Sequence, residues 1–443
     1  RHIMSQNDKL YQIFLSHPEV TSDTRALIPN GIFFALKGGN FDGNQFAAQA
    51  LEGGCAYAVV DNPAVVHGDR YILVDDVLTA MQQLAARHRR ELSLPILQVT
   101  GTNGKTTTKE LLAAVLGRKF RLLYTQGNLN NHIGVPKTLL RLRPEHQLAI
   151  IETGANHPGE IADLCRIVQA DCGVITNVGM AHLEGFGSFE GVVRTKSELY
   201  DDLRQRGGYI FLHGEDDILR RQAVGLPAVT YGLTGHQNAV EGEVVACDPC
   251  LRFRWRRAGG DWNCVPTQLI GAYNISNALC AISAGIHFGV PDADINAAIS
   301  EYCPTNNRSE LLRTAHNTLI VDAYNANLTS MTAALENFGV MEHTDKLAIL
   351  GEMRELGDFS VQAHLEVLQR LLSTDCKEAW LVGQGYEPAL AQLTPAQRSA
   401  CRLLPFPNVE SVKAYLQDHP QHDRLILVKG SNGTRLFTLP EHL

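Results

Sequence analysis

The sequence predicts an α/β protein of three units: a small α/β N-terminal module, a central parallel sheet carrying a β-hairpin appendage, and a C-terminal doubly wound unit. From residue 95 onward, short apolar runs alternate with helix-like segments, as in parallel sheets wound by right-handed crossovers. A period-two pattern at 251–265 interrupts this alternation once. At 443 residues the chain also exceeds one ordinary core, since domains average about 150 residues.

The first unit is expected over residues 4–94. Its expected strands are the apolar runs 31–38, 57–61 and 71–76. A helix is predicted over 80–93, and Pro95 then marks a plausible boundary because proline is common just after a helix ends. Residues 1–3 precede Met4 and are interpreted as a cloning remnant outside the fold.

The central unit is expected over residues 95–305. Its expected parallel strands are 95–100, 148–152, 173–177 and 209–213. The alternating segment 251–265 contains a Gly-Gly turn, which predicts a β-hairpin. A helix over 272–289 follows and ends in glycine.

The third unit is expected over residues 306–443. Its expected strands are 318–323, 346–351, 379–383 and 424–430. An amphipathic helix over 360–372 lies between the second and third of them. This second alternating block predicts another doubly wound domain.

Composition narrows the function classes. With 44% hydrophobic and 19% charged residues the chain is expected to fold, and no apolar run approaches the roughly 18 residues of a membrane span. The net charge of −8 argues against nucleic acid as a partner. Ten scattered cysteines fit reduced thiols in the cytoplasm. Cys247 and Cys250 form a C-x-x-C, but no fourth zinc ligand is recognisable, so ordinary strand cysteines are favoured.

The segment PILQVTGTNGKTTTKELLAAVL, residues 95–116, reads as strand, glycine loop and helix. Backbone N–H groups and the positive end of a helix attract phosphate oxygens, Lys105 adds a point charge, and a threonine hydroxyl can hold Mg²⁺. The loop is a shortened G-x-x-G-K-T, with Val99 where the common motif has glycine. Glycines that only turn a strand into a helix would not require the lysine and three threonines, so phosphate binding is favoured. The loop alone leaves a kinase, a motor, a switch and a ligase open.

Residues that close neighbouring strands should share the ligand edge of a parallel sheet. Glu152 ends the strand 148–152, and His182 follows the strand 173–177. If the sheet is parallel, both converge beside Lys105, where they could ligate Mg²⁺ around ATP phosphates, although imidazole is an unusual Mg²⁺ ligand. A lone histidine is more often an ordinary core or loop side chain; its place at a strand end favours the functional interpretation.

Several long motifs in the same order resemble the ATP-dependent Mur ligase family of peptidoglycan synthesis, and within it the branch that adds D-alanyl-D-alanine. They are SDTR with FFALKGGNFDGNQFAAQALEGG, TGTNGKTTTKE, GNLNNHIGVPKTLL, ETGANHPGEI, NVGMAHLEGFGSFEGVVRTKSELY, YNISNAL, VDAYNANLTSM, LGEMRELG and LVKGS. The resemblance covers essentially the whole chain.

The resemblance implies a UDP-substrate-binding module, a central P-loop ATPase and a C-terminal Rossmann-like domain that closes over the site. It implies that ATP converts the terminal carboxylate of UDP-MurNAc-tripeptide to an acyl phosphate, which the amine of D-Ala-D-Ala then attacks. Two Mg²⁺ ions, a bacterial cytoplasmic location and a monomeric state are the corresponding expectations.

The resemblance also carries residue roles. ATP contacts are implied for Gly101, Thr102, Asn103, Gly104, Lys105, Thr106, Thr107, Asn130, Asn131, Asn274, Asn277, Arg308 and Asp322. Metal ligands are implied at Thr106, Glu152, His182 and Lys196, the last as a carbamylated lysine. The expected catalytic residues are Lys105, Glu152, His182, Lys196 and Arg308. Substrate contacts are implied for Ser22, Thr24, Arg25, Asn327, Lys429 and Ser431.

Two positions depart from the pattern: Tyr273 stands where many relatives have histidine, and Ala323 where they often have serine. Which of Asn128, Asn130 and Asn131 meets phosphate stays open, and capping is a serious alternative at Ser22 and Ser431. Three alternatives to the function remain: a sibling that adds a single amino acid such as a diamino acid, a folylpolyglutamate synthetase, and a P-loop switch without ligase activity. The N-terminal module speaks against the folate enzyme.

Overall fold

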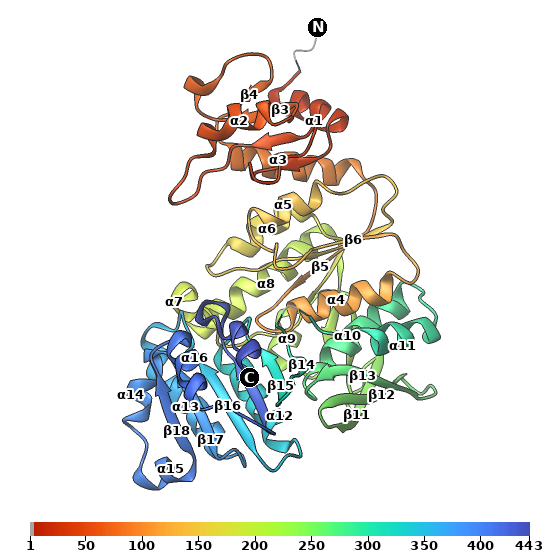
Figure 1. Ribbon diagram of the computed structural model, residues 1–443. Coiled ribbons are helices and arrows are strands. Elements are labelled where there is room, and N and C mark those ends of the chain that lie inside the picture. Colours follow the sequence, from red (N-terminus) through yellow and green to blue (C-terminus); the bar gives the residue numbers. More distant parts are fainter. Residues whose placement is uncertain (1–3, 306) are drawn as a thin grey trace.

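The computed structural model describes residues 4–305 and 307–443, and these form three sheets arranged along the molecule (Figure 1). The N-terminal module lies at one end, and the C-terminal unit packs against the other end of the central unit (Figure 1). The mixed α/β architecture predicted from the sequence is confirmed. Residues 1–3, and Asn306 at the start of the predicted third unit, lie outside the described residues.

The N-terminal module has a parallel sheet in the order β1-β2-β3-β4. Its strands are β1 (Val20–Thr21), β2 (Ile32–Phe34), β3 (Tyr57–Val60) and β4 (Tyr71–Leu73), and its helices are α1 (Gln6–Ser16), α2 (Ala47–Glu52) and α3 (Val77–Glu91). Helix α3 starts at Val77 because the Asp76 carboxylate accepts from the Thr79 backbone N–H at 2.9 Å. Helix α3 packs against α1 and also against α5 and α6 of the central unit. It therefore connects the N-terminal module to the central unit.

The central sheet has nine strands in the order β13-β12-β11-β10-β9-β8-β5-β7-β6. They are β5 (Ile96–Thr100), β6 (Leu122–Tyr124), β7 (Leu148–Glu152), β8 (Cys172–Ile175), β9 (Tyr209–His213), β10 (Ala228–Leu233), β11 (Val240–Cys247), β12 (Cys250–Arg257) and β13 (Asn263–Ile270). Strands β5 to β11 are parallel, and the predicted hairpin is the antiparallel pair β12/β13. Strand β11 was not predicted because its charged and small residues mask the alternation, and it joins the hairpin to the main sheet.

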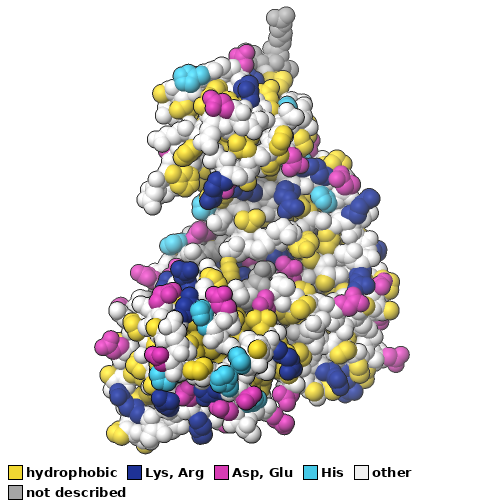
Figure 2. Space-filling view, viewed as in Figure 1, with side chains coloured by type: hydrophobic (Ala, Val, Ile, Leu, Met, Phe, Trp, Pro, Cys, Tyr) yellow, Lys and Arg dark blue, Asp and Glu magenta, His cyan; other side chains and the backbone are white. Residues whose placement is uncertain are grey.

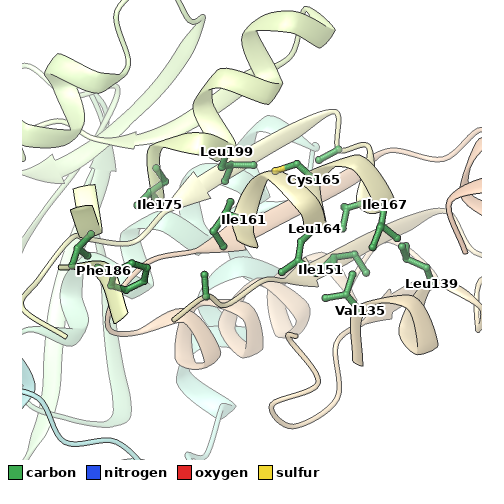
Figure 3. Close-up of a cluster of buried hydrophobic side chains, with 14 of the residues drawn as sticks. Val135, Leu139, Ile151, Ile161, Leu164, Cys165, Ile167, Ile175, Phe186 and Leu199 are labelled. Carbon is green, nitrogen blue, oxygen red and sulfur yellow. The ribbon is translucent and has the colours of Figure 1, made fainter. Parts of the chain in front are cut away.

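Helices cover both faces of the central sheet. They are α4 (Lys105–Leu116), α5 (Gly134–Leu139), α6 (Glu160–Val168), α7 (Leu183–Phe186), α8 (Phe189–Arg206), α9 (Asp217–Gln222), α10 (Asn274–His287) and α11 (Asp292–Glu301). Successive strand residues point to opposite faces, so Ile150 packs with the α4 and α10 side chains and Ile151 with those of α6. Figure 3 shows the apolar cluster on the α6 face of the sheet, with Ile151 near Ile161 and Leu164. Both faces are apolar, which leaves the strand ends for polar residues.

The C-terminal sheet has the order β14-β15-β19-β16-β17-β18, and only β14 runs antiparallel to its neighbour. Its strands are β14 (Glu310–Arg313), β15 (Thr318–Asp322), β16 (Lys346–Gly351), β17 (Glu378–Val382), β18 (Arg402–Phe406) and β19 (Leu425–Lys429). Its α-helices are α12 (Leu328–Val340), α13 (Ser360–Leu372), α14 (Glu387–Leu390), α15 (Pro395–Ala400) and α16 (Val409–Asp418). The edge strand β18 was not predicted because it contains Pro405, which the sheet tolerates at an edge.

Short 3₁₀ helices lie at Gly43–Phe46, Pro63–Val65, Gly357–Phe359, Gln384–Tyr386, Asn432–Thr434, Leu436–Thr438 and Pro440–His442. In the described parts of the chain, every helix is too short or too polar to cross a membrane.

Candidate active site

The phosphate loop connects the buried strand β5 to helix α4 and contains two glycines with positive φ. Gly101 has φ +144°, and an added Cβ would lie 1.9 Å from Thr176 Oγ1. Gly104 has φ +77°, and an added Cβ would lie 2.8 Å from Asn277 Oδ1. Both glycines are therefore needed for conformation and for close approach of other groups.

Lys105 begins α4 and folds back over its own loop. Its Nζ donates to the carbonyls of Gly101 at 2.9 Å and Thr102 at 3.3 Å. Burial lowers the pKa of Lys105, the charge of Glu152 opposes this, and Arg308 adds to the lowering. The Lys105 amine is thus held at the mouth of the loop, with Arg308 of the C-terminal unit near it.

The end of strand β8 fixes the other side of the loop. The Asn103 backbone N–H donates to Asn177 Oδ1 at 2.9 Å, and Asn177 Nδ2 donates to the Asn103 carbonyl at 3.0 Å. The Thr176 hydroxyl also donates to the Asn103 carbonyl at 2.6 Å. Asn177 is the last residue of the predicted strand 173–177 and was not among the predicted site residues; its side chain holds the loop.

Glu152 ends β7 beneath the loop and is 1% exposed. It accepts from the Thr106 hydroxyl at 3.2 Å and from Asn130 Nδ2 at 2.9 Å. Lys109, which sequence reasoning missed, is fully buried; its Nζ lies 3.8 Å from Glu152 Oε2 and donates to the Gly127 carbonyl at 3.2 Å. The predicted convergence of Glu152 with the loop is therefore present.

His182 precedes α7, and its Nδ1 contacts the carboxylate of Glu355 from the C-terminal unit. Burial lowers the pKa of His182, the Glu355 carboxylate opposes this, and the charges of Lys105 and Lys196 add to the lowering. Lys196 lies on α8, is 2% exposed, and has its Nζ 3.5 Å from the Ala155 carbonyl. Burial holds the pKa of Lys196 well below its usual value, and the nearby Lys105 charge adds to this.

The charge of Lys105 lowers the pKa values of both His182 and Lys196, and the charge of Glu152 raises that of Lys105. The Thr106 hydroxyl and the Glu152 carboxylate are hard oxygen donors of the kind that Mg²⁺ prefers. The described residues contain no group of three or more His, Cys, Asp and Glu placed to hold an ion. The Thr106 hydroxyl and the Glu152 carboxylate fit Mg²⁺, because this ion is usually bound through one or two carboxylates together with phosphates and water. The unmodified Lys196 amine does not fit Mg²⁺, which prefers oxygen ligands.

A cavity of about 360 Å³ lies between the central and C-terminal units. The loop contributes Asn103, Gly104 and Thr107; the start of α10 contributes Tyr273, Asn274 and Asn277; and the C-terminal unit contributes Arg308, Asp322 and Lys429. Eight of these nine were singled out from the sequence, and Tyr273 was noted as a departure. The cavity is therefore built by two units around the phosphate loop.

Asparagines link α10 to the loop side of this cavity. Asn277 Oδ1 accepts from the Thr108 hydroxyl at 3.0 Å, and Asn277 Nδ2 donates to Asn274 Oδ1 at 2.9 Å. Tyr273 reaches across the cavity instead: its hydroxyl lies 3.1 Å from Ser309 Oγ, which in turn donates to Asp322 at 3.2 Å. Tyr273 thus bridges the two units.

The C-terminal unit supplies charged groups to the cavity. The guanidinium of Arg308 stacks 3.8 Å from the centre of the Tyr324 ring. Lys429 Nζ lies 3.2 Å from the Asp322 carboxylate and donates to the Asn325 carbonyl at 2.7 Å. Lys429, expected to bind substrate, therefore lines this cavity.

Asn327 and Ser431 were also expected to bind substrate. Asn327 Oδ1 caps α12 by accepting from the Ser330 backbone N–H at 2.9 Å, and its side chain also pairs with Asn103. The buried Ser431 hydroxyl finds no hydrogen-bond partner among the described residues.

The group expected to contact the UDP end lies where the N-terminal module meets α5. Lys137 of α5 donates to the Ser22 hydroxyl at 2.5 Å, and burial lowers the pKa of Lys137. Arg25 forms two side-chain hydrogen bonds with Asp23, at 2.9 and 3.0 Å, which lower the pKa of Asp23 to about 2. Thr24 lies half-buried in the same turn. Figure 2 shows that the surface is hollowed between this module and the rest of the molecule.

Asn130 and Asn131 of GNLNN, both expected to contact ATP, make different contacts. Asn130 reaches Glu152, as described above. Asn131 Oδ1 accepts from the backbone N–H groups of Ile133 at 3.1 Å and Gly134 at 2.8 Å, so it caps the start of α5. The Asn130 side chain is therefore the better placed of these two toward the phosphate loop.

The fold and the site define a class that family models also recognise. Residues 99–285 match the Mur ligase middle domain, and residues 307–432 match the Mur ligase, glutamate ligase domain. The chain belongs to the Mur ligase family.

Within the family, this chain is similar to curated proteins named UDP-N-acetylmuramoyl-tripeptide–D-alanyl-D-alanine ligase. The protein from Bacillus subtilis is 38% identical over 78% of this chain and 76% of its own length. The protein from Escherichia coli is 36% identical over 82% of this chain and 80% of its own. A crystal structure of MurF from Acinetobacter baumannii covers 95% of this chain and 92% of its own, with 32% identity and a TM-score of 0.85.

Proposed function

We propose that this protein is an ATP-dependent, ADP-forming ligase that joins D-alanyl-D-alanine to UDP-N-acetylmuramoyl-tripeptide. The single observation that carries the proposal is the cavity in which a glycine phosphate loop meets Arg308 and Asp322 of a second unit, in a chain whose curated relatives share that ligase name. A sibling that adds one amino acid, or a P-loop switch, is disfavoured because those relatives carry the D-alanyl-D-alanine name.

ATP would occupy the cavity with its phosphates on residues 101–107. Lys105 and the loop N–H groups would neutralise and orient the phosphates, which is most of what phosphoryl transfer needs. Asn274 and Asn277 would border the adenine, and Asp322 the ribose. Arg308 would reach the γ-phosphate, since its charge already acts on Lys105.

Thr106 and Glu152 would hold one Mg²⁺, and Glu152, His182 and Lys196 a second. When bound, the ions would stabilise the charge that develops on the transferred phosphoryl group. Lys196 could become a ligand of the second Mg²⁺ if its amine reacted with CO₂. Burial holds the pKa of Lys196 well below its usual value, which favours the neutral amine. A neutral amine can add CO₂ to give a carbamate and a released proton. The carbamate supplies the oxygen donors that the amine lacks.

The reaction would proceed in two steps. A carboxylate oxygen of the tripeptide attacks the γ-phosphorus of ATP, the bond to the β-phosphate oxygen breaks, and ADP leaves. The amine of D-Ala-D-Ala then attacks the acyl carbon, loses a proton and releases phosphate. An acyl phosphate must be kept from water, and a cavity formed between two units would meet that need.

The UDP end of the substrate would lie at Ser22, Thr24 and Arg25, with the neighbouring Lys137 adding positive charge. Asn327 and Ser431 would contribute to the site from the C-terminal unit. We further propose domains over residues 4–94, 95–305 and 306–443, a monomeric protein, and a cytoplasmic location.

Purified protein with ATP, Mg²⁺ and UDP-MurNAc-tripeptide, offered D-Ala-D-Ala or single amino acids, tests the function. The expected result is phosphate release and a product larger by the dipeptide, both dependent on D-Ala-D-Ala. Equal release with a single amino acid would favour the sibling, and nucleotide binding without any product would favour the switch.

A further inference from the structure

The motif EMRELG, residues 352–357, follows strand β16 in the C-terminal unit, and the proposed function gives it no role. Three of its residues are tied to that unit. The Glu352 carboxylate accepts from the Gly385 N–H at 2.8 Å, and the Met353 N–H donates to His364 Nε2 at 3.0 Å. Arg354 donates to the Gly433 carbonyl at 3.3 Å. The loop is thus anchored up to Arg354.

The next residue, Glu355, turns to the central unit and contacts it at two points. Its carboxylate contacts Nδ1 of His182, and its backbone carbonyl accepts from the Glu184 N–H at 3.1 Å. Leu356 beside it is buried in the same apolar cluster as Leu183. The contact therefore combines an ion-pair geometry and a backbone hydrogen bond.

Both partners of this contact have left-handed backbones. His182 has φ +51° and Glu355 has φ +59°. This conformation costs a residue with a side chain about 1–2 kcal/mol, and such strain tends to occur where the surrounding structure has a use for it. Here it faces the two side chains toward each other across the interface between two units.

The charges of Lys105 and Lys196 both act on His182, which relates this histidine to the candidate active site. Histidines that ligate a metal commonly donate their second ring N–H to a carboxylate, which fixes the tautomer and the ring orientation. A proton on Nδ1 shared with Glu355 would leave the Nε2 lone pair free for the site.

We propose that Glu355, supplied by the C-terminal unit, is a positioning residue that orients the His182 imidazole for the metal site of the central unit. The proposal rests on the proposed function, in which His182 binds the metal. It assigns Glu355 of the EMRELG motif the task of fixing, from the C-terminal unit, a side chain of the central unit's site.

The test uses the full-length protein, ADP, and Mn²⁺ as the probe for the metal, followed by electron paramagnetic resonance. Glu355→Ala is expected to weaken Mn²⁺ binding about ten-fold, the usual cost of losing an outer-shell partner. Glu355→Gln keeps an acceptor oxygen and should lose less. Glu184→Gln is the matched control, because it removes an exposed charge two residues from His182 and should leave Mn²⁺ affinity unchanged.

Mn²⁺ affinity of Glu355→Ala within two-fold of the unmodified protein would overturn the proposal, as would an equal loss in Glu184→Gln. Thermal unfolding shows whether each variant folds, and Glu355→Gln carries the test if the alanine variant does not. An active ligase with unchanged Mn²⁺ binding rejects only the role of Glu355. A Glu355-dependent Mn²⁺ site in a protein that cannot use D-Ala-D-Ala rejects only the proposed function.

Discussion

Asn103 of the phosphate loop and Asn327 at the start of α12 exchange hydrogen bonds between the central and C-terminal units. Asn327 Nδ2 donates to Asn103 Oδ1 at 2.7 Å, and Asn103 Nδ2 donates to Asn327 Oδ1 at 3.3 Å. The same Asn327 oxygen caps α12. One side chain thus holds both the helix start and the loop that would bind phosphate.

This double role can be separated by Asn327→Asp. Aspartate still caps the helix, but it replaces the N–H₂ donor with an oxygen that faces Asn103 Oδ1. We expect the KM for ATP to rise about five-fold, the equivalent of a hydrogen bond worth roughly 1 kcal/mol. Asn408→Asp, at the matching cap of α16, should leave the KM unchanged. An unchanged KM in both variants would show that the link does not support nucleotide binding.

Gly104→Ala tests the conformation of the loop. Its φ of +77° costs a residue with a side chain about 1–2 kcal/mol, and the new Cβ would press on Asn277 Oδ1. We expect ATP affinity, measured by calorimetry, to fall at least about ten-fold because both the loop and the asparagine must shift. Gly39→Ala, where an added Cβ meets nothing within 4 Å, is the control. Unaltered affinity in Gly104→Ala would count against the loop as the phosphate site.

The carbamate on Lys196 predicts a dependence on CO₂. In buffer freed of CO₂ the ligase rate should fall more than about ten-fold, because the metal site loses a ligand. Bicarbonate should restore it. ¹³C-labelled bicarbonate should give a carbamate signal in nuclear magnetic resonance spectra, which Lys196→Ala lacks. Full activity without CO₂, together with no such signal, would refute the modification.

The buried His364 predicts acid sensitivity. Its Nε2 accepts from the Met353 N–H, and burial lowers its pKa from the ordinary value of 6.5. The unfolded state therefore binds more protons below about pH 6.5, so the free energy of unfolding should fall as the pH drops through this region. Urea titrations from pH 7.5 to 5.5 measure this slope.

In His364→Gln the slope should be shallower, since the amide oxygen can still accept but does not titrate. The exposed His67→Gln serves as the control and should keep the slope of the unmodified protein. An identical slope in both variants would mean that other groups set the acid sensitivity.

Local patterns were enough for the α/β class, most strands that build the site, and the phosphate loop. Gly101, Gly104 and Lys105 could be assigned to a phosphate loop because the strand, the glycines and the helix follow one another within a few residues. Glu152 could be assigned to the loop because parallel strands end at one edge of a sheet. Lys109 was missed because a lysine in a helix is normally on the surface, and here it is fully buried.

The amino-acid sequence by itself therefore determined most strands that build the site, the phosphate loop and the family motifs, since these depend on residues close together in the chain. Only the tertiary structure decided that Asn327 meets Asn103, that Glu355 meets His182, and that Lys137 meets Ser22. These partners are 224, 173 and 115 residues apart. Such contacts depend on how separately folded units pack, and no local periodicity records that packing.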